Sequence, residues 1–219
     1  MTGTASTAPA PEGRRYGGRT AEERRNERRD QLIEAGLEVF GTVGFAGTSI
    51  RAILRESGLA ERYFYENFAS LELLLVAVHA HVNDAVLKAV RAATNEAGAD
   101  VEARARAGVR AFIETITTDP RWVRIKLQEI GGSAGEEVQK LRLAAQEAFA
   151  EVLIAYGPNE ATLAKGLQPH ALARAVISAI ESLVDAWATG QLPVTLDSLI
   201  DHAVVIIKGT ATELERVSA

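Results

Sequence analysis

Cysteine is absent from this chain of 219 residues, which excludes disulfides and zinc sites built on thiolates. Proline is scarce, with six residues, and few segments alternate apolar and polar side chains as strands do. No apolar run approaches the roughly 18 residues of a membrane span, and the N-terminus lacks the apolar core of a secretory signal. We therefore expect an all-α, cytoplasmic protein that does not enter a membrane.

Positive charge is also in short supply, since the formal net charge is −5. Its distribution nevertheless favours one segment as a partner for nucleic acid. Residues 14–71 hold ten arginines against nine acidic side chains, whereas the rest of the chain is acidic. Arginine binds phosphates and guanine edges through two hydrogen bonds at once, which lysine cannot do.

Residues 48–68 have the pattern of two short helices around a glycine. The first has an apolar face at helical spacing, and Gly58 then supplies a residue that readily adopts a left-handed turn. Phe64 and Phe68 fall on one side of the second helix, so Arg62 and its polar neighbours point the other way. This is the pattern of a helix-turn-helix whose second helix enters a major groove.

The remaining segments read as an arm followed by long helices. Residues 1–18 are rich in small residues and proline, which predicts a disordered arm, either a solvated tail or a strand of chain that follows DNA phosphates. Glycine and proline breaks separate the helices that follow. We expect them at about 20–44, 70–95, 101–117, 120–130, 135–156, 169–189 and 195–215.

The last two predicted helices are apolar around much of their circumference. Such helices must be buried on more than one side. Two of them at the end of a chain favour a four-helix bundle between two identical protomers. The residues that we expect at this dimer interface are Ile177, Val184, Trp187, Ile200, Val204 and Ile207.

With these residues in view, the run from Arg28 to Leu75 resembles the TetR family of bacterial transcription regulators. The resemblance rests on a first helix ending in Phe40 and Gly44, the entry Thr48-Ser49-Ile50, Gly58 in the turn, and the ending Tyr65-x-x-Phe68. It implies a three-helix DNA-binding domain at residues 19–69 and a helical effector-binding and dimerisation domain at 70–219. It further implies a homodimer on a palindromic DNA operator, acting as a repressor that a small, largely apolar effector releases.

The resemblance also implies which side chains meet DNA. Glu61 and Glu66 bring negative charge to the same surface, which costs affinity unless each accepts from a cytosine amine or pairs with an arginine. Leu71 stands where family members usually carry a phosphate-binding lysine. The implied DNA contacts are Thr48, Ser49, Arg51, Arg62, Tyr63, Tyr65 and Asn67.

An effector pocket is expected in the second domain, among side chains that could equally be ordinary core. Glu181 and Asp185 lie one turn apart and could orient a polar ligand, or form a solvated strip or hydrogen bonds between subunits. The four histidines show no ligand spacing with a carboxylate, so we predict neither a metal nor a cofactor. The predicted pocket residues are Phe112, Ile116, Trp122, Ile125, Gln128, Glu129, Phe149 and Ile180.

The sequence gives less support to two other classes of function. An enzyme is disfavoured because the chain lacks cysteine and a glycine-rich phosphate-binding loop. A helical adaptor, whose helix-turn-helix contacts proteins instead of DNA, remains the alternative because the positive surplus is small.

Overall fold

The computed structural model describes residues 20–128, 136–155 and 168–218. Every regular element within these ranges is a helix, which confirms the predicted all-α fold. The predicted N-terminal arm lies outside the described residues. The elements are α1 (Ala21–Val43), α2 (Ile50–Ser57), α3 (Glu61–Asn67), α4 (Leu71–Glu96), α5 (Val101–Thr117), α6 (Pro120–Val123), the π-helix η1 (Arg124–Gln128), α7 (Glu136–Ala155), α8 (Pro169–Ala188) and α9 (Leu196–Ser218).

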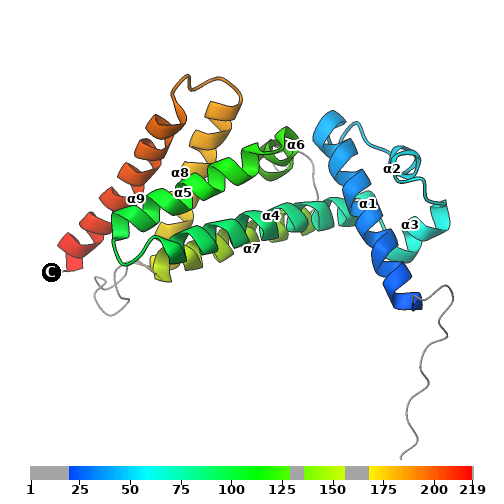
Figure 1. Ribbon diagram of the computed structural model, residues 1–219, viewed down its shortest axis with the longest axis horizontal. Coiled ribbons are helices and arrows are strands. Elements are labelled where there is room, and N and C mark those ends of the chain that lie inside the picture. Colours follow the sequence, from blue (N-terminus) through cyan, green and yellow to red (C-terminus); the bar gives the residue numbers. More distant parts are fainter. Residues whose placement is uncertain (1–19, 129–135, 156–167, 219) are drawn as a thin grey trace, which may run out of the picture.

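Helices α1 to α3 gather at one end of the molecule, and α8 and α9 lie towards the other (Figure 1). Helix α4 joins the two parts, because it packs against α1 on one side and against α5 and α7 on the other. By length and composition α4 could cross a membrane, but 50% of its most apolar window is buried inside the fold. It serves here as the central core helix. The domain boundary near residue 70 stays a prediction.

Local sequence signals set the helix starts. A capping box starts α1: the Thr20 backbone N–H donates to Glu23 Oε2 at 2.6 Å, and the Glu23 N–H donates to Thr20 Oγ1 at 3.1 Å. Ser49 and Ser70 cap α2 and α4 through their hydroxyl oxygens. Gly58 ends α2 at φ +68°, the left-handed conformation that favours glycine.

The first three helices close around buried aromatic rings. Phe40 of α1 and Phe64 of α3 are fully buried, and Phe68 is nearly so. Since Phe64 and Phe68 turn inward, the opposite side of α3 is left to face outward, as the sequence predicts. The aromatic pair therefore fixes which side of α3 a partner can reach.

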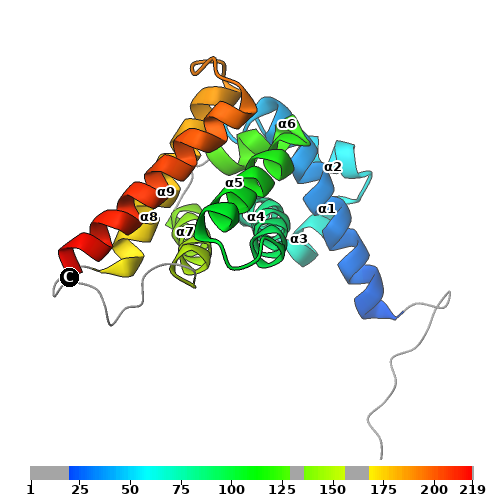
Figure 2. The ribbon, with the colours of Figure 1, turned by 60° about the vertical axis from the view of Figure 1, so that its left-hand side comes forward.

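The second part places α4 and α7 inside and α8 and α9 along one flank (Figure 2). Ion pairs at the flank join α5 to α9: Arg110 Nη2 lies 2.6 Å from Asp197 Oδ1, and Arg106 Nη1 lies 2.7 Å from Asp201 Oδ1. The segment predicted as one helix over 120–130 is instead the short α6 followed by the π-helix η1.

Candidate DNA-binding surface and effector cavity

The outward face of the short helix α3 is polar. Arg62 and Glu66 are exposed, Tyr65 is 55% exposed, and Tyr63 and Asn67 are half-buried at its edge. A helix in this position can enter a major groove with its side chains against base edges. The arrangement agrees with the outward face that the sequence predicts for Arg62.

Arg62 and Tyr63 form one unit on this face. Arg62 Nη2 donates a hydrogen bond to Tyr63 Oη at 2.5 Å, and its guanidinium carbon lies 4.5 Å from the centroid of the Tyr63 ring. The hydrogen bond to Tyr63 raises the pKa of Arg62 above its ordinary value, so the guanidinium stays charged. Its remaining N–H groups can therefore donate to a guanine edge or a phosphate.

Arginines of α1 hold α3 from behind. The Arg28 guanidinium also lies 4.5 Å from the Tyr63 ring centroid, and Arg29 lies 4.6 Å from that of Phe68. Arg25 Nη2 donates to the Glu66 carbonyl at 3.2 Å, and Arg28 Nη2 lies 3.9 Å from the Glu66 carboxylate. Glu66 is thus paired with an arginine.

The sequence alone assigns no contact with α3 to these α1 arginines. Residues at positions 25, 28 and 29 share one face of a helix, so helical spacing could have grouped them. What it could not show is that this face lies against α3.

The entry to α2 is built from hydroxyl groups. Thr48 Oγ1 donates to the Gly44 carbonyl at 2.7 Å, and Ser49 Oγ accepts from the Ala52 N–H at 3.2 Å. Arg51, in the first turn of α2, is exposed beside them. Asn67 is the last residue of α3, and its Nδ2 donates to the Tyr63 carbonyl at 2.8 Å. Thr48 and Asn67 thus already have hydrogen-bonding roles within the fold.

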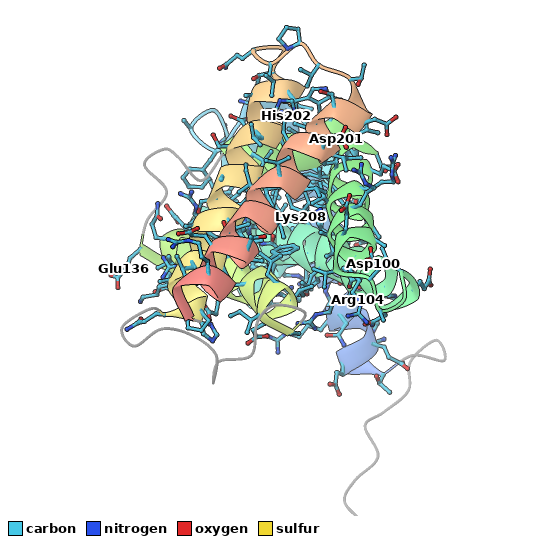
Figure 3. The ribbon with its side chains drawn as sticks, turned by 90° about the vertical axis from the view of Figure 1, so that its left-hand side faces the viewer. Asp100, Arg104, Glu136, Asp201, His202 and Lys208 are labelled. Carbon is cyan, nitrogen blue, oxygen red and sulfur yellow. The ribbon has the colours of Figure 1, made fainter. Side chains whose placement is uncertain are left out.

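An apolar cavity of about 160 Å³ lies among α4, α5, α7, α8 and α9. Its polar lining side chains are Thr94, Arg104 and Thr210, and Arg104 lies on α5 at the face shown in Figure 3. Val101, 49% exposed, marks the open end, whereas the buried side chains of Phe112 and Phe149 mark the inner end.

Three of the predicted pocket residues line this cavity: Phe112, Phe149 and Ile180. Ile116 and Ile125 are fully buried in the core, and Trp122 is half-buried with its ring centroid 6.5 Å from that of His81. These three do not line the cavity. The side chain of Gln128 and all of Glu129 lie outside the described residues.

A polar junction ties α6 and η1 to α1. Arg121 Nη1 lies 2.6 Å from Glu38 Oε2, and Arg124 Nη1 donates to the Thr42 carbonyl at 2.7 Å. Hydrogen bonds to Asp119 and Glu38 raise the pKa of Arg121 above its ordinary value. The hydrogen bond from Arg121 in turn lowers the pKa of Asp119. A Cβ at Gly41 would lie 2.5 Å from Arg121 Cβ, so the helices approach closely here.

The residues predicted at a dimer interface take two different positions. Val184, Ile200 and Val204 are at most 3% exposed, so their side chains belong to the protomer's own core. Ile177, Trp187 and Ile207 are half-buried; Trp187 Nε1 donates to the Val194 carbonyl, and Ile207 lines the cavity. The buried three therefore contribute to the packing of the protomer itself, and a role for the six residues between subunits stays a prediction.

Helices α8 and α9 lie towards the viewer in Figure 3, where Asp201, His202 and Lys208 of α9 are labelled. The outward stripe of the two helices combines small side chains with charged and polar ones. Val205 is its largest exposed apolar residue, at 68% exposure. Gly209 lies in the middle of α9 with open space where a Cβ would be. The small exposed members are Ala171, Ala175, Ser178, Ser182 and Thr212, and the exposed Arg174, His202 and Arg216 lie beside them at helical spacing.

Comparison with known proteins places the helix-turn-helix in a family. The family of bacterial regulatory proteins of the tetR type matches residues 32–78. The transcriptional activator FasR of Mycolicibacterium smegmatis is 28% identical over 187 residues, covering 82% of this chain and 81% of FasR.

Solved structures share the fold over most of the chain. A transcriptional regulator from Pseudomonas aeruginosa PAO1 is similar with a TM-score of 0.73 at 18% identity, covering 89% of this chain and 95% of that one. FadR from Bacillus subtilis, in complex with stearoyl-CoA, is similar with a TM-score of 0.67 at 14% identity, covering 84% and 97%. At these identities the likeness concerns the fold alone.

Proposed function

Because this chain is a member of the TetR family of bacterial regulatory proteins, we propose that it binds a palindromic DNA site as a homodimer and responds to an apolar effector. The observation that carries the proposal is the outward face of α3, where a charged Arg62 is held against Tyr63. Arg51 and Tyr65 extend the same polar surface. Thr48, Ser49 and Asn67 position the helices that bear it.

The homodimer rests on the outward stripe of α8 and α9. A glycine in a helix interior costs stability, and among the residues that the structure describes none lies within 4 Å of a Cβ placed on Gly209. Small side chains let two helices approach closely, and Val205 supplies an apolar contact. A two-fold axis beside this stripe would bury it against its copy in a four-helix bundle.

The effector site is the apolar cavity. Its lining suits an alkyl chain or another apolar group, and Arg104 near the open end suits an anionic head group. FadR from Bacillus subtilis, which shares the fold, binds stearoyl-CoA. We therefore take long-chain acyl thioesters as the first effector class to test on this chain.

The route from the cavity to DNA runs through η1 and α6. Lys126 of η1 lies 5.1 Å from the ring centroid of Phe149, which lines the cavity. The neighbouring Arg124 and Arg121 bind α1 of the DNA-binding part. An effector that prefers another placement of η1 would shift the spacing of the two α3 helices, and so lower DNA affinity by its differential binding.

Band-shift titration with the DNA upstream of the protein's own gene tests the DNA-binding function. The expected result is a complex whose affinity falls steeply with salt, since phosphate contacts release counterions. Absence of binding to any palindrome in that DNA would count against the regulator. A steep salt dependence would exclude the helical adaptor, whereas the absence of any DNA complex would favour it.

The effector is tested in the same titration with stearoyl-CoA, using free CoA as the matched control. Stearoyl-CoA should lower DNA affinity about 5- to 150-fold, the usual range of allosteric coupling, whereas CoA alone should leave it unchanged. Equal effects of the two compounds on DNA affinity would mean that the acyl chain, and with it the apolar cavity, plays no part in the response.

The direction of regulation has two candidates. Repression follows from an operator that overlaps a promoter, and it is the direction that the sequence predicts. Activation is favoured by the likeness to FasR, which is a transcriptional activator. Transcription in vitro from the bound promoter, with and without the protein, decides between them: fewer transcripts mean repression and more mean activation.

Catalysis has little support in this chain. Residues 131–135 read G-x-S-x-G, the letters of a nucleophile elbow, but that elbow joins a strand to a helix. Here the flanking described elements are η1 and α7, both helical.

A further inference from the structure

Glu66 occupies the middle of the outward face of α3. Successive residues of a helix turn by about 100°, so Glu66 lies about 180° from the direction midway between Phe64 and Phe68. Those two rings are buried in the core, and Arg62 lies one turn before Glu66 on the same outward side. A groove that receives the outward face of α3 therefore meets the Glu66 side chain near its floor.

The Glu66 carboxylate keeps the capacity to accept hydrogen bonds. Its side chain is 49% exposed, and Arg28 Nη2 lies 3.9 Å from its Oε2. That separation is an ion pair but longer than a hydrogen bond. The backbone of Glu66 is held more closely, because its carbonyl accepts from Arg25 Nη2 at 3.2 Å. The side chain can thus turn towards a partner while the helix stays in place.

Two arginines offset the negative charge of Glu66. The guanidinium carbons of Arg28 and Arg62 each lie 4.5 Å from the Tyr63 ring centroid. The pKa of Arg62 is raised most by its hydrogen bond to Tyr63 and to a smaller extent by the charge of Glu66. The surroundings of the carboxylate are therefore positive, which lowers the cost of bringing it close to DNA.

A carboxylate in a major groove has few partners. It repels phosphates and the acceptor atoms of guanine and thymine, and the donors exposed there are the N4 amine of cytosine and the N6 amine of adenine. Adenine carries the acceptor N7 beside its amine, which repels the second carboxylate oxygen. Cytosine carries a C–H group on the corresponding side. Cytosine is therefore the base that a carboxylate selects.

We propose that Glu66 determines specificity by accepting a hydrogen bond from the N4 amine of one cytosine in each half-site of the DNA. The inference rests on the proposed function, because it requires α3 in a major groove. It adds to the contact made by Arg62 a second contact of opposite polarity. It also gives the negative charge on this surface a role in recognition.

Selection of sites from random DNA duplexes, with the full-length wild type and with Glu66→Ala, locates the base. The wild type should enrich a cytosine at one position of each half-site, and the variant should accept any base there. Alanine is the best helix former, so α3 should keep its structure in the variant. A wild type that enriches no such cytosine, or a variant that enriches it equally, would overturn the assignment.

Glu61→Ala is the matched control, because it removes the same charge from the same helix. Glu61 is exposed and lies about 140° around α3 from Glu66. The control should therefore keep the cytosine preference. Loss of the preference in both variants would assign it to the overall charge of α3 and overturn the contact with Glu66.

A chemical change of the selected cytosine tests the hydrogen bond itself. N4-methylcytosine still pairs with guanine, but its methyl group replaces the amine hydrogen that faces the major groove. The wild type should bind the methylated duplex at least about fivefold more weakly, the lower end of what one mismatched base pair costs. Glu66→Ala should bind the methylated and unmethylated duplexes equally.

An equal loss of affinity in both proteins on methylation would overturn the hydrogen bond to Glu66. The outcomes also separate this inference from the proposed function. If the wild type enriches no duplex at all, DNA binding itself fails, and the role of Glu66 with it. Enrichment of sites that do not depend on the cytosine amine would leave DNA binding in place and overturn the role of Glu66 alone.

Discussion

At the residue scale, recognition of DNA depends on how a flexible arginine is held before DNA arrives. The hydrogen bond from Arg62 to Tyr63, and the position of Arg28 over the same ring, restrict both side chains on the outer face of α3. A side chain that is already ordered loses less conformational entropy on binding. The pair is therefore expected to contribute through its placement as well as its charge.

Replacing Arg62 with alanine should weaken operator binding by about tenfold to a hundredfold, as expected for loss of a base or phosphate contact. The band shift measures the change, and sedimentation should show an unchanged oligomeric state. Arg91→Ala is the matched control, since Arg91 pairs with Glu151 across α4 and α7, far from α3. An unaltered band shift for Arg62→Ala would remove Arg62 from the interface.

The buried histidine makes stability depend on pH. The pKa of His79 is lowered from 6.5 to about 3 in the fold, so the unfolded chain binds the proton more readily. Stability is therefore complete above pH 6.5 and falls as the pH drops from there towards 3, at about 1.4 kcal/mol per pH unit.

Urea unfolding at pH 7 and pH 5 measures this dependence. Between these values the wild type should lose about 2 kcal/mol more than His79→Gln, whose side chain does not titrate. Equal losses in the two proteins would mean that His79 is protonated in the fold or open to water.

The residues that sequence could and could not identify differ in the range of their contacts. Helical spacing sufficed for the outward face of α3, because Phe64 and Phe68 lie within two turns of Arg62. The pairing of Lys126 with Glu181 joins residues 55 apart in the chain, and no local pattern marks it.

At the element scale, helix starts and stops follow from short signals. Gly58 lies where the sequence predicts a turn, and the caps of α1, α2 and α4 are Thr20, Ser49 and Ser70, residue types that favour helix starts. The π-helix is different, because no short signal marks it; η1 packs against α4 and α8, which are distant in the sequence. A continuous helix over 120–130 was accordingly the wrong expectation at η1.

The junction of α6 with α1 leads to a prediction about coupling. Arg121→Gln removes the ion pair with Glu38, so α1 should follow movements of α6 less closely. Binding of stearoyl-CoA and of DNA should each persist, while the effect of one on the other falls several-fold from the usual 5- to 150-fold range. Band shifts with and without stearoyl-CoA measure it.

Arg110→Gln is the control for this prediction. Arg110 pairs with Glu114 and Asp197 and does not touch α1 in the part of the chain that the structure describes. Equal coupling in Arg121→Gln and the wild type would mean that the signal bypasses α6.

At the scale of the whole molecule, apolar periodicity alone cannot separate the core of a protomer from an interface between protomers. Ile200 and Val204 were expected between subunits, yet both are buried within one chain. The distinction requires knowing which side of α9 already packs on α5 and α8. The exposed stripe with Val205 and Gly209 is what remains for a partner.

Val205→Asp should dissociate the proposed dimer, because it would place an unpaired charge in the buried contact between the two protomers. Sedimentation should show a shift to monomer, while helical content by circular dichroism is kept, since Val205 is exposed in the protomer. Leu143→Asp changes a similarly exposed apolar residue of α7 and should leave the dimer intact. A dimeric Val205→Asp protein would place the interface elsewhere.

DNA recognition by two copies of α3 is tested most directly by using the full-length protein to select binding sites from a pool of random DNA duplexes. The mass of the selected protein–DNA complex is then measured to count the bound protomers. The account predicts palindromic sites whose half-sites lie about 34 Å apart along the duplex, or a multiple of that distance, with two or another even number of protomers bound. Recovery of no enriched sequence, or of sites without two-fold symmetry bound by a single protomer, would contradict it.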